Sequence, residues 1–512
     1  MNIDSIAQGQ RPSLARHRLA TIMERIGIYA TIAIVAWIIQ LAYKTYTSPL
    51  TPIPGPLYTS LTRLPLKLSI ITGRRIHFIH ALHKTHGPIV RISPDEISIS
   101  SLPEFKEIHR PGSGFLKTGW YEKFVMRHLG VFAMRDAKQH AGRRRLLARA
   151  FSKSELRASW EGVVKEKARI AVLKMRNEME DGGKCDVLKW WTFLATDVSG
   201  QLMFGEDFGM VHLGQKNEYI HILESTMKGS GINAELPLVG SIGRHLPIPH
   251  IRSMFRASSY LTSYGRRAVT NARGNSASSR NIFSGMIHAS EKSDGSLTEE
   301  DVVTEAGNLI VAGSDTTAVT LTYLIWAVLL RPRLQHELEN EVLGLEEGYG
   351  DADLEILPIL NAVIKETLRL YGAAPGSLSR SVPEGGATLA GHYIPSGTTV
   401  STQSYTIHRD PEIYHNPEEF EISRWLASGE HDQSSPATAT AMDTAFAPFG
   451  AGARTCLGIH LAYMELRLAV AEFFRVCRGV RLAASVTRES MEMENYFLIA
   501  PRGHACEVVR GV

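Results

Sequence analysis

The stretch Phe449-Gly-Ala-Gly-Ala-Arg-Thr-Cys-Leu-Gly458 surrounds one cysteine with three glycines, an arginine and an aromatic residue. Gly450 and Gly452 permit tight turns and a close backbone approach that a Cβ atom would block. The apolar run after the cysteine is typical of a helix, and the free N–H groups at its start would stabilise a thiolate at Cys456. The segment therefore predicts a cysteine held by its backbone as a metal ligand.

The neighbours of this cysteine indicate which metal group it holds. A thiolate donates electron density to a haem iron and favours O–O cleavage. Arg454 fits a charge-assisted bond to a haem propionate, Phe449 would cover the proximal face of the ring, and Gly458 would let the next helix approach the macrocycle. A lone cysteine is usually a small buried hydrophobe, but five fixed positions make a chance match improbable. The pattern predicts a haem-thiolate site.

A second motif, Ala312-Gly-Ser-Asp-Thr-Thr317, lies in a long apolar stretch. That stretch begins at the capping-box pattern Thr298-Glu-Glu-Asp301 and ends at Arg331-Pro332. We expect one long central helix, interrupted midway, where small residues leave room for oxygen. Taken alone, the motif is equally consistent with a weak helix segment.

The two motifs, in this order, resemble those of the cytochrome P450 superfamily of haem-thiolate monooxygenases. The resemblance implies a mostly α (α+β) fold, with a large helical domain, small β-sheets, and haem between the long central helix and the cysteine loop with its following helix. Strand-like alternation is indeed confined to short pieces such as 89–92 and 96–100. The resemblance also implies that Asp315 relays protons from solvent and that the Thr316 hydroxyl hydrogen-bonds the distal oxygen.

The pair Glu366-Thr-Leu-Arg369 places a carboxylate and a guanidinium three residues apart, where they meet on one helix face. By resemblance, Arg424 in the segment 417–425 completes a structural triad that locks the cysteine loop. Ile422 stands where the family usually has proline. This departure bears on the local turn and does not change the expected triad.

His140 and Arg144, four residues apart, resemble the family's propionate-binding helix positions, and Arg380 matches another such position. The alternative for the helix pair is a solvated basic face. Further basic residues surround the pair, and they predict a docking surface for an acidic reductase: Lys138, Arg143, Arg145 and Arg149. The resemblance implies haem as cofactor, electrons from NADPH through a flavoprotein, NADPH-cytochrome P450 reductase, and cytochrome b5 as an optional second donor.

The run from Cys456 to Arg467 most resembles filamentous-fungal members that act on polyketides, terpenoids or alkaloids. The predicted activity is hydroxylation or another oxidation of a lipophilic metabolite with O2. Two alternatives stay open: a haem-thiolate isomerase or peroxide-dependent enzyme without a reductase, and a non-catalytic haem-binding protein. The net charge of only +4 gives no argument for nucleic acid. Family positions that would line the substrate pocket, each of which could equally be ordinary core, are Phe115, Phe132, Leu309, Ala312, Ala373, Leu378 and Phe497.

Residues 26–43 form an uncharged apolar run between Arg25 and Lys44, near the minimum length for a membrane span. A signal peptide is the rival interpretation, but no clear cleavage site follows. We therefore predict an N-terminal tail over 1–25, a transmembrane anchor over 26–43, a proline-rich hinge over 44–56 and a catalytic domain over 57–512. The proline-containing apolar segment 236–249 is expected to dip into the membrane.

Two arguments about orientation disagree. Four arginines precede the anchor and two basic residues follow it closely, so a positive-inside count places the N-terminus in the cytosol. The resemblance places the catalytic domain in the cytosol, on the endoplasmic reticulum membrane. We follow the resemblance, because reductase and NADPH must reach this domain. Only four cysteines in 512 residues also favour a reducing compartment.

Overall fold

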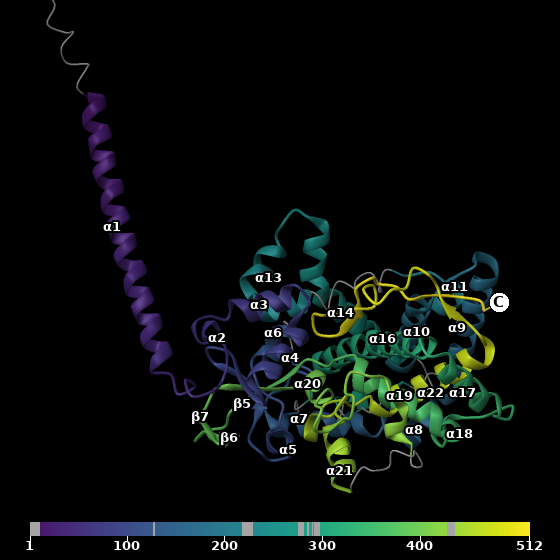
Figure 1. The fold of residues 1–512 in the computed structure, drawn as a ribbon. Coiled ribbons are helices and arrows are strands. Elements are labelled where there is room, and N and C mark those ends of the chain that lie inside the picture. The colour runs from purple at the N-terminus through teal and green to yellow at the C-terminus, as the bar shows by residue number, and fades with distance from the viewer. Residues whose placement is uncertain are drawn as a thin grey trace, which may run out of the picture.

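The computed structural model describes residues 11–125, 129–217, 229–274, 281–283, 286–288, 290, 297–426 and 436–511 (Figure 1). As predicted, the chain is mostly helical with small sheets. The helices that follow residue 56 are α2 Leu57–Leu61, α3 Leu64–Ile71, α4 Arg75–His86, α5 Leu102–His109, α6 Trp120–Val125, α7 Ala137–Ala148, α8 Lys153–Ser159, α9 Glu161–Gly182, α10 Val187–Phe204, α11 Met210–Leu213, α13 Pro237–Gly243, α14 Pro249–Gly274, α16 Glu299–Leu329, α17 Pro332–Leu343, α18 Asp351–Glu355, α19 Pro358–Tyr371, α20 Ser404–Ile407, α21 Pro436–Ala445 and α22 Ile459–Val476, with short 3-10 turns η2 Ile422–Trp425 and η3 Gly452–Arg454.

The largest sheet among the described residues has five strands in the order β1-β2-β8-β5-β3, and it contains both of the predicted strand segments. Its β2 and β8 run parallel, whereas its other neighbours are antiparallel. A three-stranded sheet, β4-β12-β9, and the hairpins β6-β7 and β10-β11 complete the β structure. The strands are β1 Ile89–Ser93, β2 Glu96–Ile99, β3 Leu116–Lys117, β4 Cys185–Asp186, β5 Ser377–Ser381, β6 Ala387–Leu389, β7 His392–Ile394, β8 Thr399–Gln403, β9 Arg481–Leu482, β10 Met493–Asn495, β11 Ile499–Pro501 and β12 Glu507–Val509.

The long central helix, α16, begins at the predicted capping box. The Thr298 hydroxyl accepts from the Asp301 N–H, and the Asp301 carboxylate accepts from the Thr298 N–H at 2.9 Å. The expected midway interruption is wrong, since α16 is helical from Glu299 to Leu329. At the small-residue motif the Thr316 hydroxyl donates to the Ala312 carbonyl oxygen at 2.8 Å, a bond compatible with an intact helix.

The hydrophobic core surrounds α16. Helices α10, α14, α19 and α22 pack against it, and most of its side chains between Val302 and Leu329 are buried. Large rings fill the layers beside it; for example, Tyr323 stacks on Tyr371 with ring centroids 5.0 Å apart. Burial on several faces explains how a helix with this many threonines remains regular. The cysteine loop leads into α22, which packs against α16.

At the N-terminus, α1 spans Arg11–Tyr46 and projects from the body formed by the rest of the chain (Figure 1). It is longer than the predicted anchor, and its membrane-spanning candidate covers Leu19–Tyr46 with no buried share. The other helix of comparable length and hydropathy is α16, which is mostly buried in the body. The predicted hinge is partly docked, because Leu50 and Ile53 lie in the core cluster of the five-stranded sheet. Residues 1–10 of the predicted tail lie outside the described residues.

Candidate functional site

The cysteine loop turns back on itself before α22. The Cys456 N–H donates to the Phe449 carbonyl oxygen at 2.8 Å. Gly450 and Gly452 adopt left-handed backbone angles, with φ of 73° and 64°. A Cβ atom on Gly452 would lie 1.8 Å from the His109 carbonyl oxygen, so a side chain is excluded there. The glycines hold the loop as the sequence predicts, one by conformation alone and the other also by close approach.

The Cys456 thiol lies at the start of α22. Its side chain is exposed, within a recess formed by the surrounding protein. Burial raises the pKa of this thiol, while the Gly458 N–H and the Arg144 guanidinium act in the opposite direction. A Cβ atom built on Gly458 would meet no protein atom within 4 Å, so the structure has room beside this glycine. The Gly458 N–H and the Arg144 guanidinium would stabilise a negative charge on the sulfur, and the room beside Gly458 fits a flat group bound by that sulfur.

Helix α16 contains the predicted oxygen-handling residues. Ala312 is exposed in the middle of an otherwise buried helix, and Asp315 and Thr316 are half-buried one turn later. The neighbouring Thr317 donates its hydroxyl proton to Glu465 Oε2 on α22 at 2.9 Å. That bond connects α22, which follows the predicted cysteine ligand, to α16, which contains the predicted proton-handling residues.

The four predicted propionate-binding residues come from α7, β5 and the cysteine loop. Arg144 Nη1 donates to the Thr455 carbonyl oxygen at 2.7 Å, directly before the cysteine. Arg454 donates to the Met134 carbonyl oxygen at 2.6 Å, and Arg380 donates to the Ser379 carbonyl oxygen at 2.9 Å. His140 is buried, and burial, followed by the positive charge of Arg454, lowers its pKa to about 4. His140 is therefore neutral at physiological pH and can donate one N–H bond.

Glu366, Arg369 and Arg424 meet in the buried space between α19 and η2. Arg369 binds Glu366 through two bonds of 2.9 and 2.7 Å, and Arg424 Nε reaches Glu366 Oε1 at 3.1 Å. Trp425 Nε1 and the Glu421 N–H also donate to this carboxylate, at 2.8 and 2.9 Å. The carboxylate thus has a complete set of donors. Despite the unusual Ile422, the chain forms the short turn η2 that places Arg424.

Most of the predicted pocket residues lie around an aromatic cluster or are half-buried, whereas one of them is part of the core. Phe132 and Phe497 lie 5.7 Å apart by ring centroid, and Phe124 of α6 contacts both, at 5.9 and 4.7 Å. The Ile499 N–H donates to the Ala373 carbonyl oxygen at 2.8 Å, which brings the turn at 373 beside this aromatic group. Leu309 and Leu378 are half-buried on α16 and β5. Phe115, by contrast, is buried in the core cluster of the five-stranded sheet, which favours the alternative that it is ordinary core.

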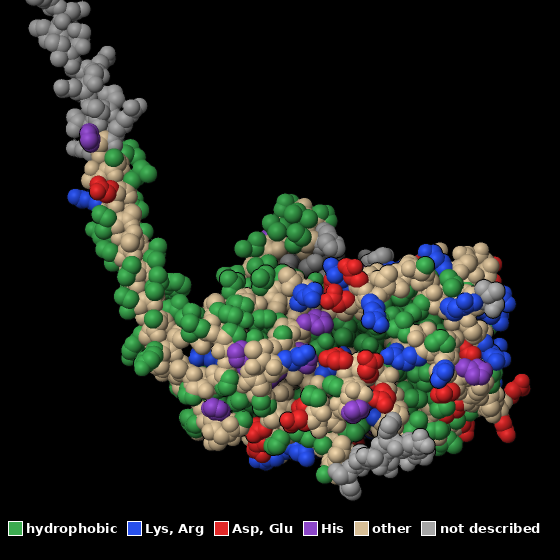
Figure 2. Space-filling model, viewed as in Figure 1, with side chains coloured by type: hydrophobic (Ala, Val, Ile, Leu, Met, Phe, Trp, Pro, Cys, Tyr) green, Lys and Arg blue, Asp and Glu red, His purple; other side chains and the backbone are tan. Residues whose placement is uncertain are grey.

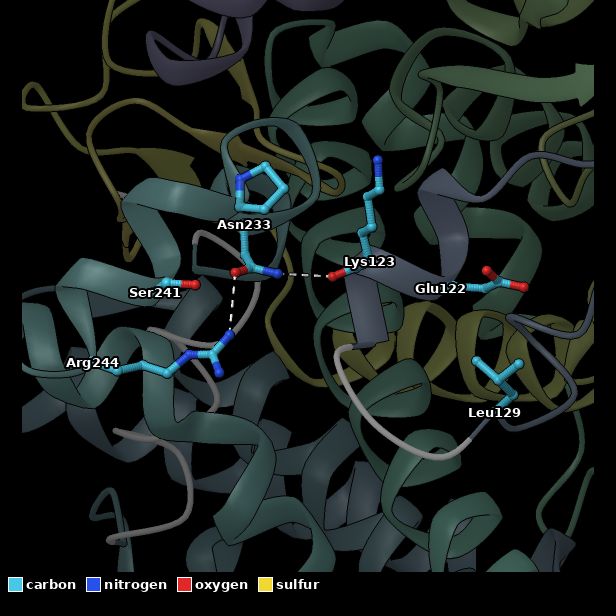
Figure 3. A pocket seen from close by; sticks show the side chains of 7 residues that line it. Glu122, Lys123, Leu129, Asn233, Ser241 and Arg244 are labelled. Atoms are coloured by element: carbon cyan, nitrogen blue, oxygen red, sulfur yellow. Dashed lines mark hydrogen bonds between the residues drawn. The ribbon is translucent and has the colours of Figure 1, made fainter.

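A surface pocket of about 510 Å³ opens beside the aromatic group, between α6 and α13 (Figure 3). Asn233 closes one side, because its Nδ2 donates to the Lys123 carbonyl oxygen at 2.9 Å and its Oδ1 accepts from Arg244 at 3.4 Å. The other lining residues mix charged, polar and apolar types: Glu122, Leu129, Pro237 and Ser241.

Comparison with known proteins identifies the family. The family model described as Cytochrome P450 matches residues 52–505. The chain is 42% identical over 495 residues to cytochrome P450 monooxygenase stcB of Emericella nidulans, a match that covers 94% of this chain and 92% of that protein. It is 39% identical to cytochrome P450 monooxygenase aflV of Aspergillus parasiticus, with 93% and 94% covered, and 28% identical to averantin hydroxylase of Dothistroma septosporum, with 89% and 84% covered.

The chain belongs to the cytochrome P450 family. The family predicted from its two motifs is thereby confirmed, and this P450 is an oxidoreductase of the oxygen-incorporating class. Membership also implies a haem-thiolate cofactor, and the residues described above fit it: a thiol at a helix start, room beside Gly458, and buried cations nearby.

One of the four basic residues predicted to form the reductase-docking surface, Arg143, is not on the surface. Arg143 is buried, and it pairs with Glu305 at 3.1 Å and with Asp301 at 2.9 Å on α16. The Arg143 guanidinium is therefore paired inside the fold and is not part of the exposed basic surface, because α7 buries one face against α16. Lys138, Arg145 and Arg149 are exposed and remain as the basic surface of α7 and its end.

Sequence reasoning missed three polar residues of this P450. His408 Nδ1 donates to the Arg369 carbonyl oxygen at 2.8 Å, and its Nε2 accepts from the Ala447 N–H at 3.0 Å, so it links the triad to the cysteine loop. Glu465, nine residues after Cys456, anchors Thr317. Lys117 is a buried lysine opposite Arg380. The clue to His408 was its position in the segment just before the triad arginine, but its partners lie far away in sequence.

Proposed function

We propose that this P450 is a haem-thiolate monooxygenase that uses O2 and NADPH-derived electrons to hydroxylate or otherwise oxidise a lipophilic small molecule in a fungal secondary-metabolic pathway. The observation that carries the proposal is the packing of α22, which follows Cys456, against α16, which contains Ala312, Asp315 and Thr316. A thiol on one side and a small residue with an acid and an alcohol on the other suit oxygen activation better than simple haem storage.

Each residue has a task in this scheme. Cys456 would hold the haem iron, with its charge stabilised by the Gly458 N–H, while Phe449 packs beside the loop against Tyr463 at 5.4 Å. His140, Arg144, Arg380 and Arg454 would hold the haem carboxylates. The haem supplies the oxygen chemistry and the electron storage when it is bound.

Proton delivery falls to α16. Asp315 would exchange protons with solvent, and the Thr316 hydroxyl would pass them toward the space beside Ala312. In the structure this hydroxyl donates to the Ala312 carbonyl oxygen, so its oxygen lone pairs can accept a hydrogen bond from a water. The bond from Thr317 to Glu465 holds this part of the helix in place.

The substrate would be bound by the aromatic group around Phe124, Phe132 and Phe497. Rings at centroid distances of 4.7 to 5.9 Å form an apolar wall suited to a lipophilic ligand. The pocket between α6 and α13 supports an access route on this side. The relatives named monooxygenases or a hydroxylase support oxidation of a fungal metabolite, with polyketides, terpenoids and alkaloids as the classes to test.

We also propose a single-pass location in the endoplasmic reticulum membrane, with the catalytic body in the cytosol. Hydrophobic side chains cover α1 and gather over α13 in Figure 2. Leu238 and Ile242 on α13, and Leu57, Leu64 and Leu68 on α2 and α3, are all exposed. An apolar helix followed by an apolar face on the body supports a protein that is both anchored to and immersed in a membrane.

The experiment is oxidation of candidate metabolites by the membrane-bound protein in 18O2, with NADPH and NADPH-cytochrome P450 reductase. One 18O atom in the product, lost when NADPH or reductase is omitted, is the expected result. Thr316→Ala should keep haem but consume NADPH without matching product. Product formed with peroxide alone, or an unlabelled isomer, would favour the reductase-independent alternative. Haem binding without turnover of any class tested would favour a binding protein.

A further inference from the structure

The carboxylate of Glu235 joins three parts of the chain that lie beside the aromatic group. Arg75, the first residue of α4, donates from Nη1 to Glu235 Oε1 at 3.0 Å. Trp120, the first residue of α6, donates from Nε1 to the same oxygen at 2.7 Å. Glu235 itself lies two residues before α13. One carboxylate oxygen therefore connects α4, α6 and the segment that leads into α13.

Residues 230–243, here called the cover segment, have a polar inner side and an apolar outer side. On the inner side, Asn233 is buried, and its Nδ2 donates to the Lys123 carbonyl oxygen of α6 at 2.9 Å (Figure 3). On the outer side, Leu238 and Ile242 are 79% and 62% exposed. Exposed leucine and isoleucine side chains do not hold the cover segment against the protein, so the polar bonds of its inner side matter for that contact.

Trp120 links the Glu235 carboxylate to the proposed substrate site. Its ring stacks on that of Phe124, with centroids 5.2 Å apart and an angle of 25° between the planes. The Phe497 ring lies 6.1 Å from it. Phe124 and Phe497 both belong to the aromatic group. Release of Glu235 therefore removes a bond that fixes the Trp120 ring at the edge of this group.

Arg75 allows the bond to Glu235 to open and close. Its Nη2 also donates to Glu96 Oε1 on β2, at 3.3 Å. The side chains of Arg75, Glu96 and Glu235 are only 12%, 15% and 14% exposed. Breaking a largely buried ion pair is costly when it leaves one charge without a partner. Here Arg75 keeps Glu96 when Glu235 departs with the cover segment toward solvent, so no buried charge is left uncompensated.

We propose that Glu235 is an ionic latch of the substrate site: its bonds to Arg75 and Trp120 hold the cover segment over the aromatic group and limit how fast ligands enter and leave. The proposal rests on the haem-thiolate function proposed above, since the ligands concerned are those that reach the haem. Dissolved ions weaken an ion pair between side chains that are still partly exposed. The latch therefore makes the rate of ligand exchange in this P450 depend on salt concentration.

The test measures stopped-flow binding of clotrimazole, a bulky ligand of haem iron, to full-length haem protein. It compares wild type with Glu235→Gln and with Glu492→Gln, a matched control because Glu492 also binds an arginine at 3.0 Å, the neighbouring Arg74. Replacing the charged acceptor at Glu235 by a neutral one should raise the association and dissociation rates about tenfold each. The dissociation constant should change little, because the latch closes over both the empty and the occupied site. Glu492→Gln should match wild type.

Two further measurements separate a latch from a contact with the ligand. Raising NaCl from about 0.05 to about 0.5 M should speed clotrimazole binding to wild type and not to Glu235→Gln. Imidazole is small, and it should bind all three proteins at one rate. If Glu235→Gln does not fold, Trp120→Phe decides, because it keeps a ring and loses the N–H bond to Glu235: faster exchange supports the latch, and unchanged exchange overturns it.

Three other results would overturn the latch. They are equal clotrimazole rates in Glu235→Gln and Glu492→Gln, a rise in the dissociation rate alone, and clotrimazole that binds neither wild type nor Glu235→Gln while imidazole binds both. Any of them together with a normal thiolate spectrum leaves the proposed function standing. Wild-type protein whose haem lacks a thiolate signature contradicts the proposed function itself.

Discussion

Two buried glutamates in this P450 differ in how many hydrogen bonds their carboxyl groups accept. Glu366 accepts hydrogen bonds from Arg369, Arg424, Trp425 and a backbone N–H, so its charge is fully compensated. Glu465 accepts a bond from Thr317 at Oε2, and its Oε1 is buried without a hydrogen-bond partner among the described residues. The first residue is expected to stabilise the loop through these bonds, and the second is expected to stay protonated, because burial raises its pKa.

Replacing Arg369 tests the first expectation. Arg369→Lys removes the two-point bond to Glu366 and the bonds to the His408, Pro417 and Glu419 carbonyl oxygens. Breaking a buried pair of this kind costs about 3–5 kcal/mol, so we expect a large loss of folded protein and of haem content.

The matched control is Arg110→Lys, because Arg110 also binds a glutamate three residues away through two bonds, but at the surface. It should melt and bind haem like wild type. Equal behaviour of the two variants would contradict a special role for the buried triad. Thermal unfolding and the haem-to-protein absorbance ratio measure both effects.

Glu465 predicts a pH dependence. Burial raises its pKa to about 8, although the Thr317 hydroxyl lowers it somewhat. Because the folded-state pKa lies above the ordinary value, the stability contributed by the bound proton is fully present below the ordinary pKa and is lost as pH rises through about 8. The stability of wild type relative to Glu465→Gln should therefore fall between about pH 5 and 8. Parallel denaturation midpoints across this range would refute the assignment.

At this scale the sequence predicted residues whose role depends on local spacing and family position. Cys456 and the Glu366–Arg369 pair are close to their partners along the chain, so their contacts follow from short patterns. Lys117 and His408 were not predicted, because their partners lie 263 and 39 positions away and only the β3–β5 register or the α19 packing brings them together.

At the scale of elements, the cysteine loop is fixed by where it meets the end of α5. The Gly452 Cα faces the His109 carbonyl oxygen, and its backbone is left-handed. The His109 ring in turn is held by a 2.8 Å bond between its Nε2 and the Thr402 Oγ1 on β8. Gly452, the end of α5 and strand β8 therefore fix the position of the cysteine loop.

Gly452→Ala should prevent this contact and reduce haem content and thermal stability strongly. Gly479→Ala is a matched control, because Gly479 has nearly the same φ of 63° but no atom within 4 Å of a built Cβ. The control carries only the left-handed backbone cost of about 1 kcal/mol. If both variants lose stability equally and both keep haem, the close approach to His109 is unimportant.

The central helix shows the limit of pattern reading for whole elements. A Gly-Ser-Asp-Thr-Thr run predicts a weak point, because hydroxyl and carboxyl side chains compete with the backbone for hydrogen bonds. In the structure the hydroxyls of Ser314, Thr316 and Thr320 donate to carbonyl oxygens four residues earlier, and the surrounding core holds the helix straight. Tertiary packing decided the outcome, and packing is not visible in a window of sequence.

For the whole molecule, hydrophobic side chains cover α1 and gather over α13, and α2 and α3 also carry exposed leucines; this is the face that we propose to meet the membrane (Figures 1 and 2). The sequence predicted the anchor and the dipping segment from apolar runs. It could not predict that α2 and α3 join this face, because their exposed leucines look like ordinary core residues until the neighbours are placed.

A chain that lacks residues 1–46 should still bind vesicles through α13. Leu238→Ser with Ile242→Ser should weaken that binding about tenfold or more, since each side chain loses apolar burial of about 1.5–3 kcal/mol. The control is Ile356→Ser, an isoleucine 79% exposed at the end of α18, which lies away from α13 in Figure 1. If none of the three proteins sediments with vesicles, α1 alone provides membrane affinity, and if all three sediment equally, Leu238 and Ile242 do not contribute to it.

The central claim is that Cys456 ligates a haem iron as a thiolate. Its most direct test is the carbon monoxide difference spectrum of the dithionite-reduced protein in membranes, for wild type and Cys456→Ser. The account predicts the strongly red-shifted Soret band of a thiolate-ligated ferrous complex in wild type and its loss in the variant. A histidine-type band, or no band, from folded wild-type protein with a full complement of haem would contradict it.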